Sequence, residues 1–64
     1  MTFKELLKKK NVTQEELAVA IGVAQSTISS WANGITYPRT RNLKKIAKTL
    51  GVSVKTLVES FEEK

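Results

Sequence analysis

Two copies of one capping pattern constrain this chain to fold through short helices. Thr2 is followed three residues later by Glu5, and the same pair recurs at Thr13 and Glu16. At this spacing, the hydroxyl and the carboxylate can each accept a backbone N–H of the first helical turn. The sequence therefore predicts one helix directly after Thr2 and a second helix at about 14–21.

Glycines and apolar spacing predict three more short helices. Gly22 ends the second helix, and a third helix over about 25–33 stops before Gly34, since glycine adopts the left-handed backbone that closes a helix. Apolar residues spaced three and four apart predict helices over about 40–50 and after Ser53. Because no stretch alternates like a strand, we expect an all-α fold, a compact bundle of five short helices.

Length and composition limit the chemistry that the chain can perform. The 64 residues predict a single domain over 1–64, and they include no Cys, His or Asp. The usual nucleophiles, bases and metal ligands are therefore mostly missing, so we expect no enzyme and no cofactor or metal site. No apolar run is long enough for a membrane span and no signal peptide opens the chain, which predicts a cytoplasmic location without membrane contact.

Positive charge is concentrated in the middle of the sequence. The net charge is +5, and residues 17–58 contain six Lys and Arg residues but no acidic residue. A block of one sign on a small protein favours an anionic partner, either nucleic acid or a membrane surface. A solvated lysine-rich helix face would give the same composition, so charge alone leaves both interpretations open. A membrane surface is disfavoured, because the apolar faces are needed for the core and no helix shows the long one-sided pattern of an interfacial segment.

The helix expected at 25–33 has one apolar face and one polar face without charge. On a helical wheel of about 100° per residue, Trp31 lies on the same side as Ile28. Polar side chains occupy the other side: Gln25, Ser26, Ser29, Ser30 and Asn33. Gln25 lies at the border between the two faces. Solvent-facing helix surfaces usually carry Glu, Lys and Arg, which form helices better. Short donor–acceptor groups can instead approach base edges in a major groove.

The second and third helices, joined by the short turn GVA, make a helix-turn-helix unit. The sequence TQEELAVAIGVAQSTISSWANG, at 13–34, resembles the phage-repressor and Cro helix-turn-helix family, also called XRE-type regulators. LKKIAKTLGVSVKTL, at 43–57, resembles the two helices that follow in that family. The resemblance covers about 11–58 and implies a lambda-repressor-like domain that binds DNA.

The resemblance also implies roles for individual residues. The residues expected to read base edges are Gln25, Ser26, Ser29 and Ser30. The residues expected at the DNA backbone are Gln14, Thr27, Asn33, Thr36, Arg39, Arg41 and Asn42. Serine makes fewer hydrogen bonds to a base than the longer Gln or Arg of many relatives. Specificity would then depend more on Gln25, on bound water or on DNA shape.

These roles predict a sequence-specific regulator of transcription, with the helix at 25–33 in the major groove of double-stranded DNA. A repressor is favoured over an activator. We expect a homodimer on a pseudo-palindromic operator, with half-sites about 34 Å apart. The alternative hypothesis is an antitoxin or another protein-interaction module on the same fold. A protein partner or a dimer mate would then dock on Val54, Val58 and Phe61, although these side chains could instead cap the small core.

Trp31 and Tyr37 each allow two interpretations. Trp31 lies on the Ile28 side of its helix, which favours packing in the core over stacking on a base. Tyr37 stands in the loop after that helix. Its hydroxyl could reach a phosphate or remain in solvent, and the sequence does not separate these alternatives.

Overall fold

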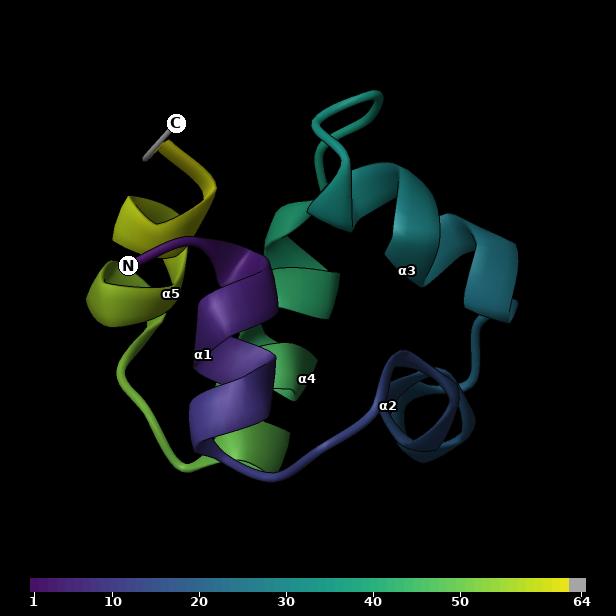
Figure 1. Cartoon of the computed structure of the whole chain (residues 1–64), viewed down its shortest axis with the longest axis horizontal. Coiled ribbons are helices and arrows are strands. Elements are labelled where there is room, and N and C mark those ends of the chain that lie inside the picture. Colours follow the sequence, from purple (N-terminus) through teal and green to yellow (C-terminus); the bar gives the residue numbers. More distant parts are fainter. Residues whose placement is uncertain (63–64) are drawn as a thin grey trace.

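A computed structural model describes residues 1–62 and places α-helices around a shared core (Figure 1). The helices are α1 Phe3–Lys9, α2 Gln14–Ile21, α3 Gln25–Ala32, α4 Thr40–Leu50 and α5 Val54–Glu62. Because α4 packs against both α2 and α5, it joins the helix-turn-helix to the pair formed by α1 and α5. Within residues 1–62 there is no strand, which confirms the expected all-α class. None of these helices is long and apolar enough to cross a membrane.

Both predicted capping boxes form. The Glu5 N–H donates to the Thr2 hydroxyl at 3.2 Å, and the Thr2 N–H donates to Glu5 Oε1 at 2.8 Å. Thr13 and Glu16 make the same two bonds at 3.0 Å each. These bonds satisfy backbone donors that a first helical turn leaves free. As a result, α1 and α2 begin where the sequence predicts.

Residues with a left-handed backbone end two of the helices. Gly22, after α2, has a φ of 76°, and Gly51, after α4, has a φ of 69°. A Cβ added to either glycine would meet no atom within 4 Å, so the backbone conformation rather than lack of space favours glycine there. Asn11 adopts the same conformation beyond α1, with a φ of 57°. α3 ends at Ala32, one residue before the predicted 33.

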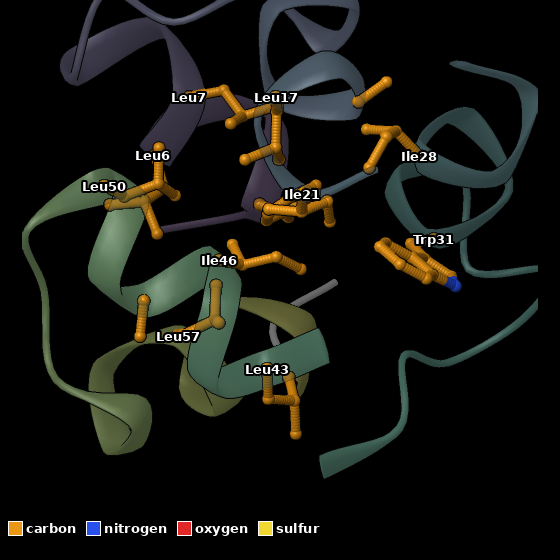
Figure 2. Packing of buried hydrophobic residues seen from close by; sticks show 13 residues of the cluster. Leu6, Leu7, Leu17, Ile21, Ile28, Trp31, Leu43, Ile46, Leu50 and Leu57 are labelled. Atoms are coloured by element: carbon orange, nitrogen blue, oxygen red, sulfur yellow. The ribbon is translucent and has the colours of Figure 1, made fainter. Parts of the chain in front are cut away.

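The core receives apolar side chains from every helix (Figure 2). Four of the most deeply buried come from four different helices: Leu17, Ile28, Ile46 and Leu57. Figure 2 shows Ile28 and Trp31 reaching inward from α3. Burying a side chain of this size contributes about 1.5–3 kcal/mol. This packing offsets the weak helix propensity of the Ser and Thr residues in α3.

The apolar stripe of α5 is mostly used to close the core. Val58 and Phe61 pack against the buried cluster, and Phe61 stacks on Phe3 of α1 with ring centroids 4.5 Å apart. Val54 remains exposed. Two of the three residues considered for a partner surface therefore cap the core instead.

Candidate nucleic-acid interface

The polar face of α3 points away from the core. Ile28 is completely buried and Trp31 is 6% exposed, which confirms core packing for Trp31 and turns the opposite side outward. The four base-reading candidates lie on this outer side. Gln25 and Ser26 are exposed, and Ser29 and Ser30 are half-buried. The arrangement leaves an uncharged, shallow surface along α3.

Two polar residues of this surface are joined to each other. Asn33 Nδ2 donates a hydrogen bond to Ser29 Oγ at 3.3 Å. The spacing of four residues places them on successive turns at the end of α3. One acceptor site of the Ser29 hydroxyl is therefore occupied, while its own O–H is still able to donate outward.

α3 and α4 begin without side-chain caps, unlike the other helices. Their N-cap residues are Ala24 and Arg39, and neither makes a side-chain cap hydrogen bond. At the start of α5, by contrast, Ser53 Oγ accepts the N–H of Thr56 at 3.1 Å. The N–H groups of an uncapped first turn attract anions, and the helix dipole adds to this attraction. Both uncapped helix starts are therefore suited to a phosphate group.

Positive charge gathers at the start of α4, against its dipole. Arg39 and Arg41 are exposed there, and the first turn contains no acidic residue. A cation at a helix N-terminus opposes the dipole by roughly 0.3–1 kcal/mol. An anion bound at this position would remove that penalty. Half-buried Asn42 lies beside these arginines and adds a neutral donor.

The other backbone-contact candidates lie on three elements. Gln14, half-buried, is the first residue of α2, and Thr27, also half-buried, lies in the first turn of α3. Thr36 is exposed in the loop between α3 and α4, which projects beyond the helices at the top of Figure 1. The N–H groups of Ile35 and Thr36 donate to the Ser30 carbonyl at 2.9 and 3.4 Å. These bonds attach the start of the loop to the end of α3.

Comparisons with known proteins decide the family. The sequence model of a family described as helix-turn-helix matches residues 3–57. The chain belongs to the helix-turn-helix family. This result confirms the resemblance to the phage-repressor and Cro regulators that the segments at 13–34 and 43–57 indicate.

Two curated relatives of this helix-turn-helix chain are regulators of transcription by name. One is the HTH-type transcriptional activator BcrR of Enterococcus faecalis, 38% identical over 66 residues. The other is the cryptic phage CTXphi transcriptional repressor RstR of Vibrio cholerae, 32% identical over 59 residues. The matches cover 97% and 92% of this chain but only 32% and 53% of the relatives. This chain thus spans about a third and about half of their lengths.

Sequence reasoning missed two features of the helix-turn-helix domain. The first is the pair of uncapped helix starts, although the signal was present, because neither Ala24 nor Arg39 belongs to the usual N-cap residues. The second feature is the environment of Tyr37, whose ring lies 5.4 Å from that of Phe61, centroid to centroid. No local sequence pattern predicts a contact between residues so far apart in the sequence.

Proposed function

We propose that this helix-turn-helix chain acts as one DNA-binding domain of a sequence-specific transcription regulator, with α3 in the major groove of double-stranded DNA. The observation that carries the proposal is the uncharged outer face of α3, held outward by buried Ile28 and Trp31. Its short side chains allow the helix to approach base edges closely. The first turns of α3 and α4, which have no side-chain cap, would bind phosphates.

The proposed contacts divide between bases and phosphates. Gln25 is exposed and can make two hydrogen bonds to adenine, while each serine of α3 would add one bond. Arg39 and Arg41 would hold phosphates through charge, and Gln14 would do so through a neutral amide. Phosphate contacts set the position of the domain on the duplex, and base contacts select the sequence.

We propose a homodimer on DNA. A single α3 presents few base-reading side chains, so one copy reads only a short half-site. Two copies related by a two-fold axis would read a pseudo-palindromic operator, with half-sites about 34 Å apart. Repression is the proposed outcome, because occupation of an operator excludes other proteins without requiring a further contact surface.

Selection from a random pool of double-stranded DNA tests the proposal. We expect a palindromic consensus, and a reporter promoter that carries this consensus should lose expression when the protein is present. A pool that yields no preferred sequence would overturn sequence-specific binding. A consensus without two-fold symmetry would overturn the dimer, and increased reporter expression would overturn repression.

A further inference from the structure

An aromatic contact attaches the loop between α3 and α4 to the end of α5. The ring centroids of Tyr37 and Phe61 lie 5.4 Å apart, with 59° between the ring planes. Phe61 in turn stacks on Phe3 of α1, with centroids 4.5 Å apart. Aromatic pairs at these separations attract each other beyond the effect of burial alone. The three rings therefore form a row from the loop to α1.

Hydrogen bonds and burial restrain the two ends of this loop. At its start, the N–H groups of Ile35 and Thr36 donate to the Ser30 carbonyl. At its end, Pro38 is buried. The Ile35 side chain is 74% exposed and provides little packing. The ring of Tyr37 thus supplies the packing contact between the two anchored ends.

The residues next to this contact are candidates for the DNA backbone. Thr36 precedes Tyr37 directly and Arg39 follows Pro38, and both side chains are exposed. We propose that Tyr37 and Phe61 are positioning residues, whose ring contact holds the loop so that Thr36 and Arg39 meet phosphates. This inference rests on the proposed DNA-binding function. Without the contact, the loop would have to be ordered upon binding, and the lost entropy would weaken the complex.

Because Tyr37 is largely exposed, its proposed role in positioning the loop can be tested apart from any role in the core. Its side chain is 53% exposed, so its removal leaves the buried cluster intact. Phe61 belongs to α5, which lies on the far side of the molecule from α3 in Figure 1. Phe61 also packs against the core, so an effect of Phe61 on DNA binding is assigned to the loop only where it depends on Arg39.

A double-mutant cycle on DNA affinity tests the proposal. Tyr37→Ala should weaken binding to the selected operator by about 3- to 10-fold. Most of this loss should disappear in an Arg39→Ala background, because the loop contact with phosphate is already gone there. In a Gln14→Ala background the full loss should remain, since Gln14 lies on another element. Phe61→Leu should weaken binding with the same dependence on Arg39.

Two controls separate a positioning role from a loss of folding and from a direct contact by the hydroxyl. Tyr37→Phe should restore the affinity lost in Tyr37→Ala, because the ring is kept and only the hydroxyl is missing. Urea unfolding gives the folded fraction of each variant, so that affinity is compared for folded protein alone. Equal losses with and without Arg39, or a Tyr37→Phe variant as weak as Tyr37→Ala, would overturn the proposal. Failure of the proposed function would show differently, as wild-type protein that prefers no DNA sequence.

Discussion

The outer face of α3 combines one long amide with short hydroxyls. Gln25 can make two hydrogen bonds with an adenine edge, whereas Ser26 can make one with a base edge of either polarity. Base selectivity should therefore be uneven within a half-site. We expect one strongly preferred base pair opposite Gln25 and weaker preferences opposite the serines.

Replacement of Gln25 tests this division. Gln25→Ala should lower affinity for the preferred base pair by about 1–3 kcal/mol and leave binding to other sequences nearly unchanged. Arg41→Ala should instead weaken binding to all sequences alike, because phosphates carry no sequence information. Fluorescence anisotropy with the operator and its single-base variants measures both effects. Equal behaviour of the two variants would show that the assignment of roles is wrong.

At the scale of the element, the helices differ in how their first turns are capped. α1 and α2 carry complete capping boxes. α3 and α4 have no side-chain cap. A missing cap costs a helix roughly 0.5–2 kcal/mol. Under the proposed function, DNA phosphates would lie at these two helix starts, where the helix dipole favours an anion, so these helices would be stabilised further in the complex.

Adding a cap to α3 should therefore increase stability and decrease DNA binding. Ala24→Asp supplies an acceptor for the first turn, and we expect unfolding in urea to require about 0.5–2 kcal/mol more. The new carboxylate would repel a phosphate at the same position. Ala24→Ser is the matched uncharged control, which should gain stability with a smaller loss of affinity. An Ala24→Asp protein that binds DNA as tightly as wild type would show that no phosphate sits there.

The capping box of α1 predicts a pH dependence of stability. The hydrogen bond from the Thr2 N–H, followed by the bond with the Thr2 hydroxyl, lowers the pKa of the Glu5 carboxyl below its usual value. A lowered pKa in the folded state stabilises the protein above the ordinary glutamate pKa. This stabilisation is lost as the pH falls through the folded value. In urea unfolding between pH 6 and pH 3, Glu5→Gln should show a smaller acid loss than wild type, since Gln keeps the cap without titrating. Identical curves would contradict this assignment.

Helix boundaries could be predicted because their signals are local. The Thr-x-x-Glu pairs predicted the starts of α1 and α2, and Gly22 predicted the end of α2. The outward face of α3 also followed from the spacing of Ile28 and Trp31. The contact between Tyr37 and Phe61 could not be predicted, because it depends on how the helices pack. The same packing decides that Val58 is half-buried while Val54 is exposed.

At the scale of the molecule, charge should govern how strongly the domain is attracted to DNA. The acid-free segment 17–58 contributes six positive charges. On the structure, Arg39 and Arg41 lie at the start of α4, and the exposed lysines Lys44, Lys45 and Lys48 continue along that helix. Such a distribution raises the rate of encounter with a polyanion and adds affinity that depends on salt.

Salt titration measures the number of these contacts. With Arg39 and Arg41 at phosphates in each half of a dimer, log K should fall with log salt at a slope of about −3.6, since each phosphate contact contributes about −0.9. Arg41→Ala should reduce the steepness to about −1.8. Gln14→Ala should weaken binding without changing the slope, because a neutral amide releases no counterion. A slope near zero for wild type would contradict the proposed backbone contacts.

The open space around Gly51 has a consequence for chemical synthesis. Its φ of 69° and the absence of atoms within 4 Å of an added Cβ mean that handedness alone selects glycine there. A residue of opposite chirality prefers this region of backbone space as much as an ordinary residue avoids it. In a synthetic chain with D-alanine in place of Gly51, the free energy of unfolding measured in urea should therefore rise by about 0.4–1 kcal/mol, because the unfolded state has less conformational entropy. The Gly51→Ala chain, which carries L-alanine at the same position, should lose about 1–2 kcal/mol, so the configuration of one residue would set the sign of the change.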